Sequence, residues 1–290
     1  MVVGSWDAAG IIDKVLIYAL SLMSAGSSIF LFVFSRYIQE SERRSIVRMT
    51  CGLAALALVV TVLRVPIIAG ALGGDMASMW DMSLLQFVLQ SSEGHAVALR
   101  SVGLALIFSL SADLSAARIA GLVGSLLVAV SFAFTGHSVE LGFLPRLLVA
   151  VHLVGVSYWV GAFYPLRGLT RGADLRRIAT IMKRFGDIAL FVVGALILAG
   201  ALLLWIVLET PLALFASDYG RLLAVKLLFV VGLLSLAAAN KLILTPALLT
   251  GDISASARLR ISIDAELALG AIILTVTAVL TTVSGPPALD

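Results

Sequence analysis

The stretch DIALFVVGALILAGALLLWIVL, residues 187–208, decides the fold class of this chain. After its first residue it carries no charge, and it is long enough to cross the hydrocarbon core of a bilayer as an α-helix, which takes about 20 apolar residues. Stretches of this kind recur along most of the chain. Eight are predicted, at residues 11–34, 49–70, 95–112, 118–136, 146–166, 187–208, 221–243 and 261–283.

The overall composition agrees with these spans. Of the 290 residues, 61% are hydrophobic and 13% are charged, and the mean hydropathy is +1.11, whereas soluble domains contain about 25% charged residues. Lipid offers no partner to unpaired backbone groups, so each span must be helical. We therefore expect an all-α fold, a polytopic membrane bundle of about eight helices that forms a single domain over residues 1–290. The first residues lack a basic segment before a cleavage site, so no removable signal peptide is expected.

The positions of the basic residues predict the topology. Cytoplasmic loops are enriched in lysine and arginine, and two predicted connections are rich in them: Arg36, Arg43, Arg44 and Arg48 after the first span, and Arg167, Arg171, Arg176, Arg177, Lys183 and Arg184 after the fifth. With eight spans, both termini then face the periplasm. The opposite, outer segments carry mostly acids, which attract cations: Asp7, Asp13, Asp75, Asp81, Glu93, Glu140, Glu209, Asp218 and Asp290.

The long outer connection between the second and third spans contains a cluster of methionines. Met76, Met79 and Met82 recur every third residue, with Asp75 and Asp81 beside them. Thioether sulfur is a soft ligand that favours Cu(I), and on successive turns of a helix the three side chains would share a face. The alternative is that they are apolar residues of a short interfacial helix, with Trp80 as an interface aromatic.

All three histidines fall near the outer ends of predicted spans. A histidine beside lipid is costly unless a partner, water or metal satisfies it. His95 and His137 lie at span edges, where they could simply reach water, but His152 lies about two turns into the fifth span and shares a face with Gly155 and Trp159. His152 is either a functional residue or a packed histidine bonded to a backbone carbonyl.

Charged residues also fall inside the spans. Arg64, Arg100 and Lys226 are predicted toward the outer side, and Asp264 and Glu266 near the inner end of the eighth span. Each should face the bundle or water, because charge exposed to acyl chains is costly. The cations either pair with outer carboxylates such as Glu93 and Asp81 or serve structure, and Glu266 could form an inner polar relay with Asn240 or Lys226.

Two long stretches resemble the bacterial copper resistance D (CopD) family of membrane proteins. Residues 134–166 read FTGHSVELGFLPRLLVAVHLVGVSYWVGAFYPL, and residues 219–249 read YGRLLAVKLLFVVGLLSLAAANKLILTPALL, followed by LRISIDAELALGAIILTVTAVLTT at 259–282. The similar residues are Gly136, His137, His152, Trp159, Gly161, Ala162, Tyr219, Gly220, Lys226, Asn240, Pro246 and Glu266. The resemblance implies an eight-helix inner-membrane protein that is linked to copper uptake and works beside a periplasmic copper-binding protein of the CopC kind.

These observations favour a copper permease that imports copper from the periplasm. Met76, Met79 and Met82 with the outer acids would collect the ion, and His137 and His152, with His95, would hold it at the bundle mouth. Supporting roles are expected for Trp159, Glu93, Glu140, Lys226, Asn240 and Glu266. Cu(I) is favoured at the methionines, and Cu(II) also suits imidazole.

Two other functions stay open at this stage. A b-type cytochrome or cupric reductase could place haem between His152 and His95 or His137. A membrane anchor for a periplasmic copper chaperone would transport nothing. The chain has no Gly-x-x-x-x-Gly-Lys-Ser/Thr phosphate-binding loop, so we expect no nucleotide hydrolysis within it, and transport would run downhill or on an ion gradient. The chain is expected to be a transporter rather than an enzyme.

Overall fold

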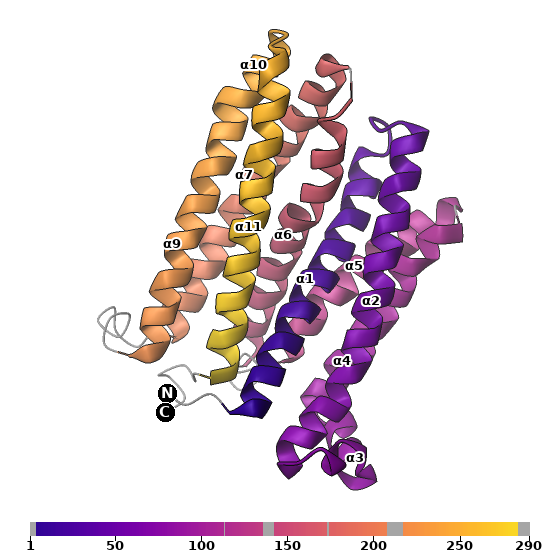
Figure 1. Ribbon diagram of the computed structural model, residues 1–290, viewed down its shortest axis with the longest axis vertical. Coiled ribbons are helices and arrows are strands. Elements are labelled where there is room, and N and C mark those ends of the chain that lie inside the picture. The colour runs from indigo at the N-terminus through magenta and orange to yellow at the C-terminus, as the bar shows by residue number, and fades with distance from the viewer. Residues whose placement is uncertain (1–3, 113, 136–141, 173, 208–216, 284–290) are drawn as a thin grey trace.

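The computed structural model describes residues 4–112, 114–135, 142–172, 174–207 and 217–283 (Figure 1). Within them every regular element is helical, and eight helices are long and apolar enough to cross a membrane, which confirms the predicted fold class. These spans are formed by α1 (Ser5–Phe34), α2 (Glu40–Gly73), α4 with η2 (Ser92–Phe108, Ser109–Ala112), α5 with η3 (Ser115–Ser131, Phe132–Phe134), α6 (Phe143–Leu169), α7 (Leu175–Val207), α9 with η5 and α10 (Asp218–Ala239, Asn240–Leu244, Thr245–Leu249) and α11 (Ile253–Val283). The connection between α2 and α4 contains η1 (Ala77–Trp80) and α3 (Met82–Gln90).

Helix α1 is the centre of the bundle. It packs against α2 and α5 on one side and against α6 and α11 on the other, while α4 packs on α5 and α2, α7 on α6, and α9 on α11 (Figure 1). The middle of α1 is buried and built from small residues: Ser21, Ser24, Ala25, Gly26, Ser27 and Ser28. Small side chains let membrane helices approach closely where hydrophobic driving force between them is weak.

The closest approach joins α1 to α6. A Cβ atom placed on Gly26 would overlap the carbonyl of Ser157 and lie 2.8 Å from the Cα of Gly161. At the same level the hydroxyl of Ser27 donates a hydrogen bond of 2.8 Å to the carbonyl of Gly161. The two backbones therefore touch directly, and neither glycine position has room for a side chain.

Several helices extend beyond their predicted bounds. Helix α7 begins at Leu175 rather than 187, so the prediction that Arg176, Arg177, Lys183 and Arg184 lie in a loop is wrong. The early turns are amphipathic: Ile178, Ala179, Ile181 and Met182 are buried in the core, while the basic residues lie on the other face. Hydropathy marks only the part of a helix that crosses lipid, which is why α11 also begins earlier, at Ile253, and the seventh span ends later, at Leu249.

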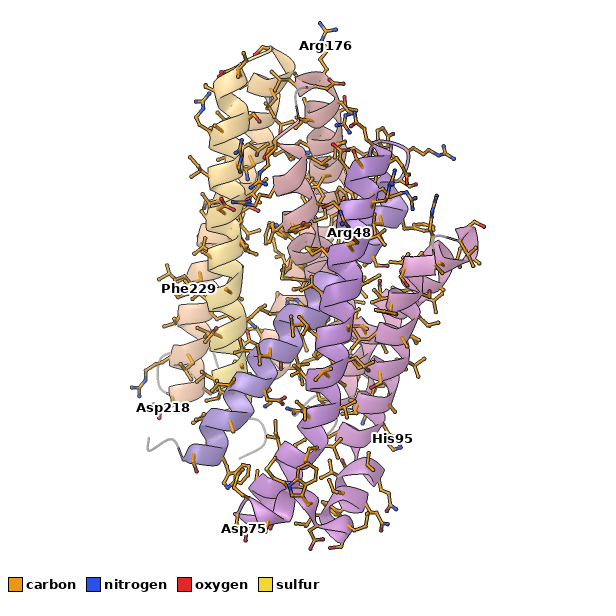
Figure 2. The ribbon with its side chains drawn as sticks, turned by 45° about the vertical axis from the view of Figure 1, so that its right-hand side comes forward. Arg48, Asp75, His95, Arg176, Asp218 and Phe229 are labelled. Atoms are coloured by element: carbon orange, nitrogen blue, oxygen red, sulfur yellow. The ribbon has the colours of Figure 1, made fainter. Side chains whose placement is uncertain are left out.

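The two ends of the bundle carry different charges. Asp75, Asp218 and His95 lie toward one end, whereas Arg176 lies at the opposite end and Arg48 is displaced toward it (Figure 2). Helix α1 begins and α11 ends at the first of these ends, called the acidic end below (Figure 1). The opposite, basic end also contains acids, and Glu40, Glu42 and Asp187 there pair with Arg43, Arg177 and Lys241.

The α1–α6 contact can be tested by Gly26→Val. We expect this variant to lose stability by about 1–3 kcal/mol or more, because an added side chain in a filled contact forces the helices apart. Cys51 is the one cysteine and is buried, so a thiol-reactive dye reports thermal unfolding. The control is Gly194→Val on α7, where a Cβ atom meets nothing within 4 Å. Equal shifts in the two variants would contradict the assigned contact.

Candidate functional site

The methionine segment between α2 and α4 is not one helix. Met76 precedes η1, Met79 lies within it, and Met82 begins α3. Between them the backbone of Asp81 is extended (φ −68°, ψ 118°), and its carboxylate accepts hydrogen bonds from the backbone N–H groups of Ser83 and Leu84. Because Asp81 caps α3 and breaks the helix there, the prediction that the three methionines share one helical face is wrong.

The three thioethers have different surroundings. The side chains of Met76 and Met82 are exposed, at 71% and 67%. Met79 instead packs against α2, where a Cβ atom on Gly70 would lie 2.6 Å from its Cγ, beside the ring of Trp6. Two of the three sulfur atoms are therefore open to an arriving ion, and the third holds the segment against α1 and α2.

Two carboxylates flank the exposed methionines. The backbone N–H of Ser78 donates to Asp75 at 2.8 Å, and this hydrogen bond lowers the pKa of Asp75. The Ser83 hydroxyl, followed by the backbone N–H groups of Leu84 and Ser83, lowers the pKa of Asp81. Both carboxylates lie outside the membrane-spanning helices. Because their pKa values are lowered, they stay negatively charged at lower pH than an ordinary aspartate does, and the segment attracts cations.

The histidines occupy separate places. His95 lies exposed in the first turns of α4 (Figure 2). His152 is partly buried on α6, where the backbone of Leu196 on α7 and Lys226 of α9 are close enough to affect it electrostatically. Its Nδ1 has no hydrogen-bond partner among the described residues. Gly155 also meets Leu196, as the predicted shared face requires. His137 and Glu140 lie outside the described residues.

The predicted ligands do not converge among the residues that the structure covers. No group of three or more His, Cys, Asp or Glu side chains there could hold a metal ion. His95 belongs to α4, which packs on α2 and α5, whereas His152 faces α7. These two histidines therefore lie at different helix contacts. The methionine segment packs on α2 and α4 at the acidic end of the bundle. It lies away from α6, the helix that carries His152 (Figure 1).

A buried ion cluster joins α1, α2 and α4. Arg64 donates to Asp13 at 2.6 Å and to the two carboxylate oxygens of Glu93 at 3.0 and 3.1 Å. The predicted pairing of Arg64 with Glu93 is confirmed, whereas Asp81 caps α3 instead. Asp13 was not predicted as a partner of Arg64. The signal for it was an Asp-Lys pair inside an apolar helix. The neighbouring Lys14 donates a hydrogen bond to the Thr281 carbonyl at 2.6 Å.

Arg100 is the most deeply buried cation of this region. It is 2% exposed, its guanidinium lies 4.1 Å from the centre of the Phe132 ring, and its Nε donates to the Ser131 hydroxyl at 3.1 Å. An aromatic face stabilises a cation without a carboxylate. Arg64 and Arg100 thus have partners within the fold. This agrees with the interpretation that these two cations serve structure.

A second buried polar cluster joins α6, η5 and α11. Glu266 is 4% exposed and accepts hydrogen bonds from the Trp159 indole at 3.5 Å and from the Asn240 amide at 2.5 Å. The predicted contact of Glu266 with Asn240 is present, and Lys226 lies near His152 instead. The indole of Trp159 as a partner of Glu266 was not predicted. Asp264, two residues before Glu266 on α11, pairs with Arg167 of α6.

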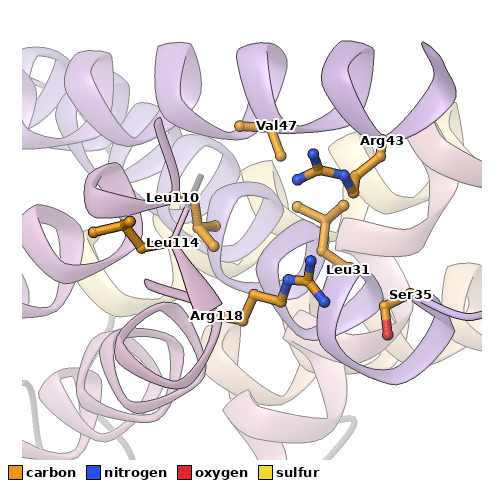
Figure 3. Close-up of a pocket in the computed structure, with 7 residues that line it drawn as sticks. All are labelled: Leu31, Ser35, Arg43, Val47, Leu110, Leu114 and Arg118. Carbon is orange, nitrogen blue, oxygen red and sulfur yellow. The ribbon is translucent and has the colours of Figure 1, made fainter. Parts of the chain in front are cut away.

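A small pocket lies near the basic end, between α1, α2, η2 and α5 (Figure 3). Its lining is Leu31, Ser35, Arg43, Val47, Leu110, Leu114 and Arg118. These residues include two arginines but no thioether, imidazole, thiol or carboxylate. The pocket is therefore unsuitable for copper. The candidate metal-binding side chains that the structure describes, Met76, Met79, Met82, His95 and His152, lie toward the acidic end.

The fold defines a polytopic helical membrane protein, and thioether and imidazole side chains lie toward its acidic end. The comparisons with known proteins give its family. Residues 5–142 match the family described as "Copper resistance protein D-like, N-terminal domain", and residues 179–280 match "Copper resistance protein D". The chain belongs to the copper resistance protein D family.

A curated relative supports this membership. The chain is 27% identical over 292 residues to "Copper transport protein CutJ" of Bacillus subtilis (strain 168), and the match covers 95% of this chain. The chain spans about half, 52%, of the length of that relative. No solved structure matches the chain.

Neutralising Arg64 tests whether the α1–α2–α4 cluster is structural. We expect Arg64→Gln to cost about 3–5 kcal/mol of stability, because it leaves Asp13 and Glu93 as unpaired buried charges. Thermal unfolding of the purified protein measures the loss. Adding Asp13→Asn and Glu93→Gln should restore much of the stability, since no uncompensated carboxylate then remains.

A matched surface variant serves as the control. The pair of Arg258 with Asp252 is solvent-screened, at 54% and 37% side-chain exposure, so Arg258→Gln should change stability little. An Arg64→Gln variant as stable as this control would contradict the structural role of the cluster.

Proposed function

We propose that the protein transports copper across the bacterial inner membrane, importing it from the periplasm into the cytoplasm. The observation that carries this proposal is that both halves of the chain, with their eight apolar helices, match a copper resistance family. The relative from Bacillus subtilis is named a copper transport protein. Copper is the cargo here, and the chain acts as a transporter rather than an enzyme.

The proposed orientation places the acidic end and both termini in the periplasm. The support is the positive-inside rule, applied to the separation of Asp75 and Asp218 from Arg176 and Arg48. In this orientation an incoming cation first meets a negative surface, which raises its local concentration.

Copper capture is proposed at the methionine segment. Met76 and Met82 supply exposed thioethers, Asp75 and Asp81 supply charge beside them, and Met79 fixes the segment against α2. Thioether ligands favour Cu(I) over harder ions. His95, exposed at the start of α4, is the nearest imidazole along the chain to this segment and is proposed as a further ligand.

The ion then passes to the second half of the bundle. His152 is suited to receive it, because its Nδ1 is buried and without a partner in the described part of the chain, and an unsatisfied imidazole nitrogen in a low-dielectric site gains from a metal. His137 is proposed as a further ligand, and Glu140 and Lys226 are proposed in supporting roles. Imidazole also accepts Cu(II), so the histidines accommodate either oxidation state.

A periplasmic copper-binding protein of the CopC kind is the proposed donor. Its support is the resemblance of residues 134–166 to the CopD family and the exposed, acidic methionine segment as a place for transfer. Copper handed over as a bound ion never equilibrates with the periplasm, which limits release of a toxic metal.

Copper uptake into proteoliposomes that contain only this chain tests the proposal. We expect His152→Ala and the triple Met76→Leu, Met79→Leu, Met82→Leu variant each to lower the initial uptake rate roughly tenfold, equivalent to about 1.4 kcal/mol, because each removes ligands that hold the ion. Elemental analysis of the purified variants measures the accompanying loss of bound copper.

The control replaces a methionine at the basic end. Met49→Leu makes the same replacement at the end opposite to the proposed entry site, and it should leave uptake unchanged. Wild-type uptake equal to that of empty liposomes would contradict transport and favour a non-transporting anchor. A Soret band that shifts on reduction would instead favour a cytochrome.

A further inference from the structure

We propose that Glu266 is a proton-binding site that couples copper movement to the pH gradient. Its carboxylate binds one proton, becomes a neutral acid, and returns that proton when a copper ion passes. The coupling rests on the proposed copper transport, whereas proton binding by Glu266 stands without it. Three features of the surrounding structure support the inference.

The first feature is that Glu266 lacks a fixed counter-charge. Asp13 and Glu93, the carboxylates of the other buried cluster, both pair with Arg64. Within the described part of the chain, Glu266 is bonded to two neutral side chains, Trp159 and Asn240. A single carboxylate in a low-dielectric interior is costly unless a cation neutralises it.

None of the charged groups that the structure describes on the surrounding helices is paired with Glu266. On α11 and α6, Asp264 pairs with Arg167, and Arg260 acts electrostatically on Asp264. On η5 and α7, Lys241 pairs with Asp187 at 2.7 Å. Tyr158 of α6 donates to the Phe185 carbonyl, Lys226 of α9 lies near His152, and Asp13 and Lys14 of α1 belong to the outer cluster. Since no fixed cation is paired with Glu266, a mobile one, either a proton or the transported ion, is left to neutralise it.

The second feature is that the site suits both protonation states. As a carboxylate, Glu266 accepts from the indole N–H of Trp159 and the amide N–H of Asn240. As an acid, its O–H needs an acceptor, and the Asn240 Oδ1 is buried without a partner among the described residues. A rotation of the Asn240 amide exchanges donor for acceptor, so this amide can bond Glu266 in either protonation state.

The third feature is the backbone at Asn240. This residue begins η5, a π-helical turn over Asn240–Leu244, and the Thr245 hydroxyl donates to the Asn240 carbonyl at 2.8 Å. Such turns are rare, occur often at functional sites, and interrupt the regular α-helical bonding. The turn gives Asn240 freedom to follow a change in Glu266, while the Thr245 hydroxyl keeps its carbonyl satisfied.

The surroundings provide a route for the proton. Asn240 is partly exposed, and the next residue, Lys241, joins Asp187 and through it Lys183, at the basic end. Toward the acidic end, His152 lies two turns before Trp159 on α6. A cuprous ion and a proton carry equal charge, so exchange of one for the other at a single carboxylate balances charge.

Infrared difference spectroscopy of the protein in lipid nanodiscs tests proton binding directly. We expect a pH-dependent carbonyl band from a protonated carboxyl group that is missing in Glu266→Gln, which keeps the size of the side chain. Asp264→Asn, whose parent residue pairs with Arg167, is the matched control and should retain the band. An unchanged band in Glu266→Gln would overturn the proposal.

Proteoliposomes with a trapped pH indicator test the coupling. Copper uptake by the wild type should make the lumen more alkaline as protons leave, and an outward proton gradient should raise the uptake rate severalfold. Glu266→Gln should lose both effects. Copper uptake without a change in lumen pH would overturn the coupling while leaving transport intact. Absence of any uptake would instead overturn the proposed function, and the infrared result would still decide whether Glu266 binds a proton.

Discussion

The structure depends on the direct contact of two backbones, where α1 crosses α6. Gly26 and Gly161 leave no space for a side chain, and the Ser27 hydroxyl bonds the Gly161 carbonyl. In lipid, apolar side chains gain little by meeting each other, so close backbone packing and hydrogen bonds hold helices together. This contact fixes α1 with α2, α4 and α5 to α6 and its neighbours, and therefore sets the positions of both polar clusters.

The two halves treat buried charge differently. In the first half, Arg64 satisfies Asp13 and Glu93, and Arg100 lies over Phe132, so the charges are balanced by groups that cannot leave. Such a cluster specifies how helices pack and costs much to disrupt. In the second half, within the described residues, Glu266 has neutral partners and one ring nitrogen of His152 has no partner. Groups that are not already paired with a fixed cation are suited to bind a mobile cation reversibly.

Much of the fold was predictable from the sequence, because lipid forces apolar stretches into helices of a set length. The bounds were less predictable: the amphipathic start of α7 has too many charges for a hydropathy signal, although Ile178 and Ile181 bury one face. Single charges in apolar runs correctly indicated Arg64, Arg100 and Glu266 as buried, but their partners depend on which helices meet. Asp13 and Trp159 come from distant helices, and spacing along one chain carries no information on such contacts.

The packing of the second half also bears on how an ion could pass. The most apolar stretches of α7 and α9 bury almost none of their residues inside the bundle, so these stretches present most of their surface outward. Asn240 links the α9 end to Glu266 on α11, and through Glu266 to Trp159 on α6. A change of charge at Glu266 therefore alters the contact between three helices at once. The α1–α6 contact supplies the frame, and the polar cluster at Glu266 lies where α9 and α11 meet α6.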